Sequence, residues 1–224
     1  MGRAKEIIIK VIPAKIANDF VKKHHYSGKV VPNSQLHFGA FLDGKLHGVM
    51  SYGPSTDKRK IIGLVEGTGW NEFLELNRMA FDDVLPRNSE SRCISLSLKL
   101  IKKNAPQIKW VVSFADGCQC GDGTIYRASN FVLTGIKRNT GLRADENGVV
   151  YSQVTFSAHR PNEMDKFRQM KPVEGYMLRY IYFIDKSYKE RLTVPILPFS
   201  DIDKYGAGMY KGSKVSRQER HEKT

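Results

Sequence analysis

The sequence has few cysteines, few acidic residues relative to basic ones, and no long apolar run. Three cysteines, Cys93, Cys118 and Cys120, are too few for a disulfide framework and predict a reducing, cytoplasmic location. No stretch approaches the roughly eighteen apolar residues that a membrane helix requires, and the first residues do not resemble a signal peptide. We therefore expect neither a disulfide-stapled secreted protein nor a membrane-spanning one.

What the sequence does contain is a basic, foldable chain. Its 224 residues are 41% hydrophobic and 10% aromatic, as is typical of a globular protein. Thirty-six Lys and Arg against twenty-three Asp and Glu leave a net charge of +13. Basic side chains bind nucleic acids by neutralising phosphates, so the excess indicates a polyanionic partner. A generally basic protein without such a partner is the alternative.

The order of apolar patterns and turn signals predicts a mixed α/β (α+β) fold with a central sheet flanked by helices. We expect one domain over residues 1–200 and a flexible or surface-draped extension over 201–224, where aliphatic residues are scarce. A hairpin is expected at Asp43-Gly44, and Leu142 to Gly148 reads as a polar break. Predicted strands are 6–13, 73–81, 108–116, 131–139, 149–157 and 176–185, and predicted helices are 14–27, 93–105 and 121–130.

Two residues follow the apolar run 108–116, which is typical of a strand buried on both faces. Asp116 ends that strand, at the sheet edge where α/β proteins bind ligands, so it could be a general base, an acceptor that positions an amine, or a metal ligand. Capping the next helix is the structural alternative. Tyr126 lies one turn into that helix and could donate a proton to a leaving group, or simply pack in the core.

The predicted helix 14–27, with Ile16, Phe20 and Val21 on its apolar face, ends in a second polar group. His25 could act as a base or bind iron, with Tyr26 beside it. Stabilisation of the helix carboxyl end by positive side chains explains the same residues equally well.

Arg78 alternates with Leu76 and Ala80, which predicts one shared face for all three, with Glu75 and Asn77 on the other. A charge in an apolar strand is costly unless it is paired, and Glu75 or Asp116 could pair with Arg78. The guanidinium could otherwise hold an anionic donor or a backbone phosphate.

Other polar positions have two interpretations each. Ser91 and Arg92, at the start of the predicted helix 93–105, suit either anion binding or capping. Cys118 and Cys120 lack the spacing and the second ligand pair of a zinc site, so we interpret them as loop residues. The aromatic and basic stretch 176–191 suits either base stacking or a half-buried strand.

Predicted DNA contacts are Lys22, Lys23, Arg127, Lys137, Arg138 and Arg179.

The order of elements over residues 73–137 resembles the central motif of the GNAT acyltransferases. Several motifs together resemble, more specifically, the Mom family of phage DNA-modification proteins, a divergent GNAT-like group, over about residues 15–140. These motifs are "KHHYS", "ELNRMAFDD", "LPRNSESR", "VSFADG" and "GTIYRASNF". The loop "LPRNSESR" departs from the Gly-rich GNAT signature, and Asn130 replaces the usual glycine.

The resemblance implies conversion of the exocyclic amine of adenine in double-stranded DNA to a carbamoylmethyl derivative, which protects phage DNA from restriction. The implied donor is acetyl-coenzyme A or glycyl-tRNA, and iron dependence is implied with His25, Asp116 and Tyr126 as candidate ligands. The alternatives are an ordinary GNAT N-acetyltransferase and a non-catalytic DNA-binding protein; the oligomeric state stays open, a dimer included. The implied catalytic residues are His25, Tyr26, Asp116 and Tyr126, and the implied donor-binding residues are Arg78, Ser91 and Arg92.

Overall fold

A computed structural model describes residues 3–216 and 219. These residues group into two compact units, and each unit is made of separate chain segments. Unit 1 comprises the described residues up to Phe114, Gly123–Thr134 and Arg179–Leu197. Unit 2 comprises Ala115–Asp122, Gly135–Leu178 and the described residues from Pro198 onward. The expected domain limits, 1–200 and 201–224, remain a prediction.

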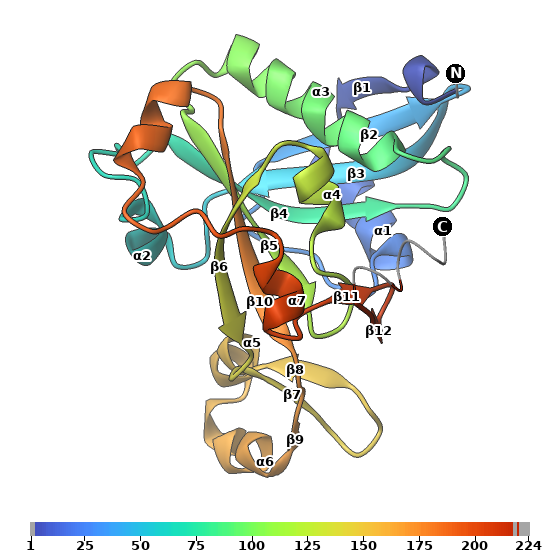
Figure 1. Cartoon of the computed structure of the whole chain (residues 1–224). Coiled ribbons are helices and arrows are strands. Elements are labelled where there is room, and N and C mark those ends of the chain that lie inside the picture. Colours follow the sequence, from blue (N-terminus) through green and yellow to red (C-terminus); the bar gives the residue numbers. More distant parts are fainter. Residues whose placement is uncertain (1–2, 217–218, 220–224) are drawn as a thin grey trace. The chain divides into compact units, whose positions relative to one another are not determined.

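A seven-stranded mixed sheet in the order β1-β2-β3-β4-β5-β10-β6 dominates unit 1, which confirms the predicted mixed α/β class (Figure 1). The last residues of β5 and β6 and the first of β10 belong to unit 2. The elements are η1 (Arg3–Glu6), β1 (Ile8–Val11), α1 (Ala14–His24), β2 (Leu36–Leu42), β3 (Lys45–Gly53), α2 (Lys58–Ile62), β4 (Phe73–Phe81), α3 (Ser89–Asn104), β5 (Trp110–Gly117), α4 (Thr124–Ala128), β6 (Val132–Arg138), β10 (Tyr176–Phe183) and η3 (Lys186–Arg191).

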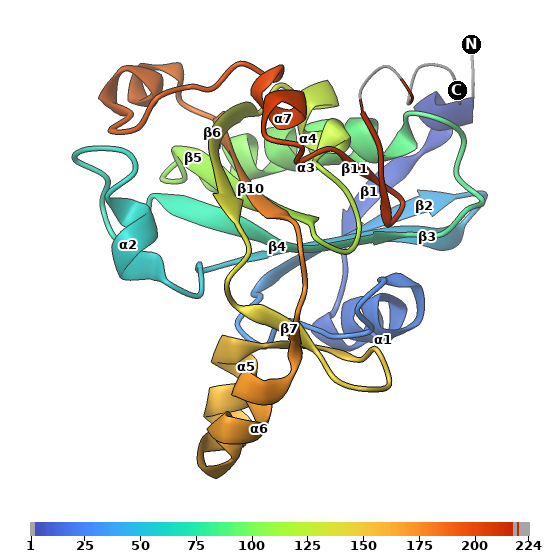
Figure 2. The ribbon, with the colours of Figure 1, turned by 60° about the horizontal axis from the view of Figure 1, so that its bottom comes forward.

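Helices α1 and α3 cover opposite faces of the sheet (Figure 2). On α1, Val21 is buried against β3 and β4 and Phe20 packs against the same cluster, as predicted. Ile16 is 47% exposed, and Ala17 is buried in its place, so the prediction was wrong for Ile16. The β2–β3 hairpin turns at Asp43 and Gly44 as predicted, with φ values of 51° and 75°. Two positive φ angles match a two-residue turn whose twist suits the flanking strands.

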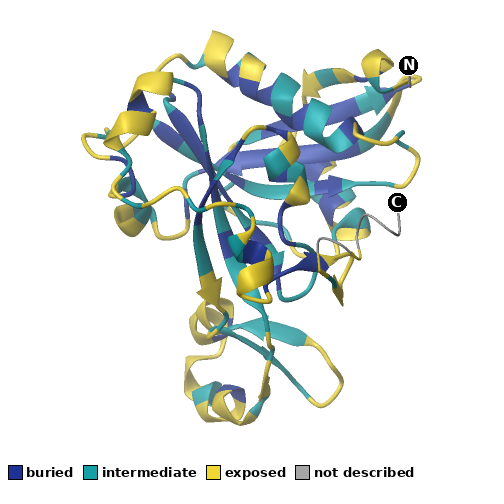
Figure 3. Cartoon of the chain, in the orientation of Figure 1, coloured by how far each residue is buried: buried dark blue, intermediate teal, exposed yellow. Residues whose placement is uncertain are grey.

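The buried core is concentrated on the central strands (Figure 3). The rings of Phe73 and Trp110, at the first positions of β4 and β5, stack with centroids 4.5 Å apart. One cluster of buried residues joins these strands to β10 and η3; it consists of Leu64, Val65, Phe73, Trp110, Val112, Ile181, Phe183 and Tyr188. The apolar runs that predicted these strands therefore meet in one place.

A bulge in β4 corrects the predicted faces of that strand. Ser51 pairs with Arg78, but the next residue of β3, Tyr52, pairs with Leu76, so Asn77 is the extra residue. Successive residues of β3 point to opposite faces, so Leu76 and Arg78 also face opposite sides. Glu75 pairs with Gly53 and therefore shares the face of Arg78. Simple alternation placed Arg78 on the face of Leu76 and Glu75 on the opposite face, because it assumed an unbroken register.

Unit 2 contains a three-stranded sheet in the order β8-β7-β9 with two short helices, and the carboxy-terminal segment. Its elements are β7 (Leu142–Ala144), β8 (Val150–Ser152), α5 (Gln153–His159), η2 (Pro161–Glu163), α6 (Met164–Gln169), β9 (Lys171–Pro172), α7 (Asp201–Lys204), β11 (Met209–Tyr210) and β12 (Ser213–Lys214). The polar break beginning at Leu142 thus contains a strand.

The predicted strand 149–157 was correct only through Ser152. From Gln153 the chain is helical, which leaves Val154 65% exposed and buries Phe156 against Phe167 of α6, with ring centroids 5.2 Å apart. A strand would have put Val154 and Phe156 on one face, but only one of them has a partner to cover it.

The carboxy-terminal segment contains more regular structure than its composition predicts. Through residue 216 it forms α7 and the β11–β12 hairpin, and it buries Ile202 and Met209. The rest of the predicted flexible tail, apart from Glu219, lies outside the described residues. No helix found among the described residues has the length and apolarity needed to cross a membrane.

Candidate functional site

The parallel pairing of β4 with β5 is short. It joins Phe73–Glu75 to Trp110–Val112, and one further contact follows, in which Ser113 Oγ donates to the Leu76 carbonyl at 3.2 Å. The bulge at Asn77 comes next, so the backbone of β4 changes direction where its pairing with β5 ends. A bulge changes the direction in which the neighbouring side chains point, and bulges are common next to active sites. The polar residues of β4 lie at this point.

His25 is the carboxyl cap of α1, and its imidazole is half-buried. Burial, with a smaller contribution from the positive charge of Arg78, lowers the pKa of His25 to about 4. The ring is therefore neutral near pH 7. Nδ1 accepts the Ser27 backbone N–H at 3.1 Å, which assigns the ring proton to Nε2. In this tautomer His25 offers Nε2 as a hydrogen-bond donor, whereas the sequence suggested a base.

Arg78 and Glu75 complete an electrostatically coupled group with His25. Burial raises the pKa of Glu75, against the opposing effects of hydrogen bonds to Ser55 and Asn77 and of the Arg78 charge. The raised pKa of Glu75 lies closer to neutral pH than that of an ordinary carboxyl. A group whose pKa is near the working pH transfers protons most efficiently. The charge of Arg78 thus acts on both side chains, while its predicted pairing with Glu75 or Asp116 stays a prediction.

A hydrogen-bonded frame holds the bulge residue. Asn77 Oδ1 accepts from Ser34 Oγ at 3.1 Å, and its Nδ2 donates to the Pro54 carbonyl at 3.3 Å. Asn33 Nδ2 donates to the same carbonyl at 2.8 Å. The loop before β2 and the end of β3 thereby fix the position of the extra residue. Asn77 is a positioning residue that alternation alone ranked low.

Asp116 belongs to unit 2 and organises the loop after β5. Its carboxylate accepts from the Cys118 backbone N–H at 3.0 Å and from Gln119 Nε2 at 2.8 Å, while its carbonyl accepts from the N–H groups of Cys120 and Gly121. The helix α4 is capped by Gly123 instead. Asp116 therefore does not cap α4, and its predicted catalytic role stays a prediction.

Tyr126 belongs to unit 1 and is only 7% exposed. Its ring contacts those of Phe131 and Tyr180, at centroid distances of 5.5 and 5.3 Å. Asn130, just before Phe131, has a φ of 63°, the left-handed conformation that asparagine tolerates in the place of the usual glycine. The packing of the Tyr126 ring agrees with the core alternative; its acid role stays a prediction. Tyr26, by contrast, is exposed and lies beside the His25 ring at 4.3 Å.

The first turn of α3 carries the predicted donor-binding residues. Ser91 Oγ donates to the Asn88 carbonyl at 3.2 Å, so it does not cap the free N–H groups of α3, whose N-cap is Asn88. Arg92 Nη2 donates to the Lys5 carbonyl at 3.3 Å, whereas its Nε is buried and has no hydrogen-bond partner among the described residues. A free N–H of a guanidinium beside a helix amino terminus fits an anionic group. The donor-binding role of Ser91 and Arg92 stays a prediction.

The predicted DNA contacts are distributed over both units. Lys22 and Lys23 are exposed on the last turn of α1, and Lys137 and Arg138 are exposed at the end of β6. Arg127 is half-buried on α4. The guanidinium of Arg179 donates to Thr134 Oγ1 at 3.0 Å and to the Thr134 carbonyl at 2.8 Å, which ties β10 to β6. Arg179 thus has a structural role whether or not it touches DNA.

The chain as a whole has counterparts among known proteins. A model of the Mom protein family matches residues 6–201. The chain belongs to the Mom protein family. A curated relative, Methylcarbamoylase mom of Escherichia phage Mu, is 34% identical over 200 residues, which cover 86% of this chain and 82% of the relative.

Solved structures resemble this Mom-family chain more distantly. The N-acetyltransferase of Staphylococcus aureus Mu50 has a TM-score of 0.48 at 9% identity and covers 80% of this chain and 99% of its own. The ribosomal-protein-S18-alanine N-acetyltransferase of Escherichia coli has a TM-score of 0.47 at 11% identity and covers 80% of this chain and 94% of its own.

Iron is the cofactor that resemblance to the Mom family implied. Over residues 3–216 and 219, no three His, Cys, Asp or Glu side chains gather as a metal-ion group would require. Of the candidates, His25 has its Nδ1 occupied by the Ser27 backbone N–H. The described side chains do not fit an iron centre, so we derive no step through iron.

Sequence reasoning ranked Glu75 low, but in this member of the Mom family it shares the face of Arg78 and burial raises its pKa. The signal that could have identified it was the same as for Arg78: a charge in an otherwise apolar strand. Its placement beside Arg78 depends on the bulge, which no local pattern indicates.

Proposed function

We propose that this chain transfers a two-carbon amide group to the exocyclic amine of adenine in double-stranded DNA, giving the carbamoylmethyl derivative. The observation that carries the proposal is membership of the Mom family, together with 34% identity to a relative named methylcarbamoylase. The net charge of +13 supports a polyanionic substrate. Protection of the DNA from restriction is part of the same proposal.

The polar group at the β4 bulge supports a reaction at an amine. The target base has to leave the stack before its amine can reach a half-buried site. In our proposal the neutral His25 donates from Nε2 to a ring nitrogen or to a developing oxyanion, and Arg78 holds an anionic group. Glu75, with its raised pKa, accepts the proton that the amine loses. Asp116 and Tyr126 remain the further candidates for amine positioning and for proton donation to the leaving group.

The atoms of the product restrict the donor. Acetyl transfer from coenzyme A to adenine gives an amide that contains no added nitrogen. Glycyl transfer from tRNA, with attack of the amine on the ester carbonyl and release of the ribose hydroxyl, supplies both carbons and the nitrogen. The resulting glycyl amide is an isomer of the carbamoylmethyl product, so only a rearrangement of bonds would remain. Ser91 and Arg92 would hold the phosphates of either donor.

The test is expression in a bacterium, enzymatic digestion of the DNA to nucleosides, and mass spectrometry. We expect an adenosine heavier by one carbamoylmethyl group in place of hydrogen. Because the glycyl isomer has the same mass, acid hydrolysis to free bases separates the two: the glycyl amide gives glycine and adenine, and the carbamoylmethyl group gives carboxymethyl adenine. An acetylated adenosine would instead favour the ordinary acetyltransferase, and unmodified DNA with retained DNA binding would favour the non-catalytic protein.

Matched variants separate catalytic from structural roles. His25→Asn should abolish the product, whereas His24→Asn, one residue earlier, should retain it, because His24 stacks only on Phe20. Asp116→Asn should also abolish the product if the carboxylate acts on the amine. Gln119→Ala removes one donor from the Asp116 carboxylate and should leave activity largely intact. Equal losses in both variants would reduce Asp116 to a loop residue.

A further inference from the structure

A second concave site lies in unit 1, at the end of the sheet where β4 and β5 begin. It is a cavity of about 550 Å³ bordered by Trp70, Phe73 and the segment after α3. Its volume falls in the range of small-molecule sites. Lys58 Nζ lies 4.4 Å from the centroid of the Trp70 ring and 5.7 Å from that of Phe73. The cavity therefore combines flat aromatic surface with a cation.

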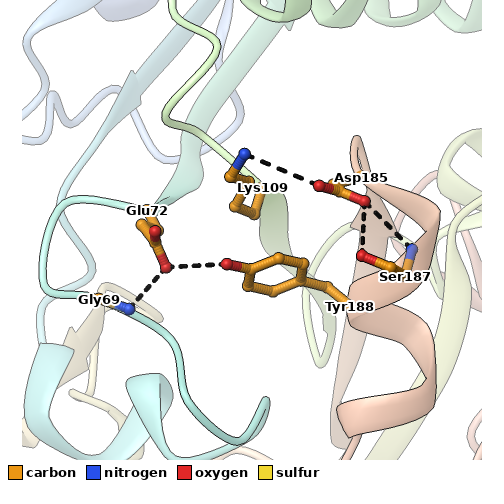
Figure 4. Close-up of polar contacts among 6 residues, drawn as sticks. All are labelled: Gly69, Glu72, Lys109, Asp185, Ser187 and Tyr188. Carbon is orange, nitrogen blue, oxygen red and sulfur yellow. Dashed lines mark hydrogen bonds and ion pairs between the residues drawn. The ribbon is translucent and has the colours of Figure 1, made fainter.

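Trp70 is held in place although it is 54% exposed. Glu72 Oε2 accepts from the Gly69 backbone N–H at 2.7 Å and from the Tyr188 hydroxyl at 3.1 Å (Figure 4). The Lys109 backbone N–H donates to the Glu72 carbonyl at 2.6 Å. These hydrogen bonds fix the backbone at Gly69 and Glu72, on either side of Trp70. The exposed indole therefore extends from a loop of fixed conformation. A large aromatic ring on a fixed loop is suited to stacking.

Three amide side chains border the same cavity: Gln35, Asn71 and Gln107. All three residues are exposed, and none of their side chains makes a hydrogen bond to any residue that the structure describes. The contact of Lys58 with Trp70 could stabilise the surface by itself, but it does not account for three available amides around one hollow. An amide offers a donor and an acceptor side by side, which matches the amino group and adjacent ring nitrogen of adenine.

We propose that this cavity binds an adenine nucleotide, with the base stacked on Trp70, its polar edge read by the amides and its phosphate paired with Lys58. Stacking on an exposed aromatic ring and one cation for the phosphate are the usual components of single-nucleotide recognition. The nucleotide could be free or part of a nucleic acid, since both present the same groups. The proposal does not depend on the transfer reaction, whose polar residues lie at the β4 bulge.

Tryptophan emission gives a direct test on the full chain. The chain has two tryptophans, and Trp110 is fully buried, so quenching by an added ligand reports on Trp70. We expect saturable quenching by adenosine monophosphate and weaker quenching by cytidine monophosphate. Quenching by single-stranded oligodeoxyadenylate alone would assign the site to a nucleic acid. No saturable quenching by either adenine ligand, or equal affinity for the two monophosphates, would overturn the proposal.

Equilibrium dialysis with labelled ligand tests the residues independently of fluorescence. Trp70→Leu should weaken binding about tenfold or more, and Gln107→Ala and Lys58→Ala should each weaken it severalfold. Tyr205→Leu is the matched control, because Tyr205 is an aromatic of similar exposure, 51%, that does not line this cavity. Unchanged affinity in Trp70→Leu, Gln107→Ala and Lys58→Ala would refute the assignment even where some binding persists.

Discussion

Replacing His25 should remove a defined part of the acid sensitivity of this protein. The folded protein holds the pKa of His25 at about 4, whereas an unfolded histidine has a pKa of about 6.5. Between these values the unfolded chain binds more protons, so folding stability falls as the pH falls through this window. The pKa difference corresponds to about 3 kcal/mol in full, of which about 2 kcal/mol is lost between about pH 7 and about pH 5.

The assay is urea unfolding at a series of pH values, comparing wild type with His25→Asn. The free energy of unfolding of the wild type should fall by about 2 kcal/mol more than that of the variant on acidification to about pH 5. Glu75 acts with the opposite sign, because its raised pKa makes the folded state bind extra protons above the ordinary carboxyl range. Both proteins contain Glu75, so its contribution largely cancels in the difference.

His24→Asn serves as the control and should retain the wild-type pH dependence, since His25 is intact. If wild type and His25→Asn lost stability in parallel, the buried neutral histidine would be refuted. The same result would refute the assignment of His25 Nε2 as a hydrogen-bond donor of a neutral ring at neutral pH.

Substitutions at four further residues test the electrostatics and packing. Arg78→Met should raise the pKa of His25, because the positive charge of Arg78 helps to lower it, and an NMR titration of the imidazole would detect the change. Asn130→Ala should cost about 1 kcal/mol in thermal unfolding because of the φ of 63°, whereas Asn130→Gly should be nearly neutral. Tyr52→Phe should cost about 1 kcal/mol, since Ser97 Oγ still donates to a helix carbonyl, while Ser97→Ala should cost more because it leaves the buried Tyr52 hydroxyl without that 2.6 Å partner.

Features of the fold that depend on a few neighbouring residues were predictable. The turn at Asp43-Gly44 and the left-handed Asn130 follow from backbone preferences of single residues. The helix α3 follows from its length, its Ser and Glu start and its late lysines, since its apolar spacing alone fits strand and helix alike. The bulge at Asn77 was not predictable, because a register shift is decided by the partner strand and by the loop contacts that hold the extra residue. That one shift changes the neighbours of Glu75 and Arg78, so it also limited the prediction of the site.

The prediction of short helices and strands also failed. From Val150 to Ser157 the apolar residues fit strand and helix alike, and the choice is made by Phe167, which is distant in the sequence and packs on Phe156. The predicted roles of Asp116 and Tyr126 rest on family resemblance, since their local contacts also suit a loop and a core. Chemistry of this kind depends on residues brought together from far along the chain.

The interleaving of the two units has a consequence for how the chain reaches its native state. Strand β10 lies between β5 and β6 in the sheet although β6 precedes it in the sequence, with the β7–β9 region made in between. The sheet of unit 1 therefore stays open, with β5 lacking its neighbour, until Phe183 has been synthesised. A nascent chain would expose this apolar strand edge from the synthesis of β5 until β10 has been made. Truncations anywhere before that strand should yield aggregates, and no contiguous fragment reproduces either unit.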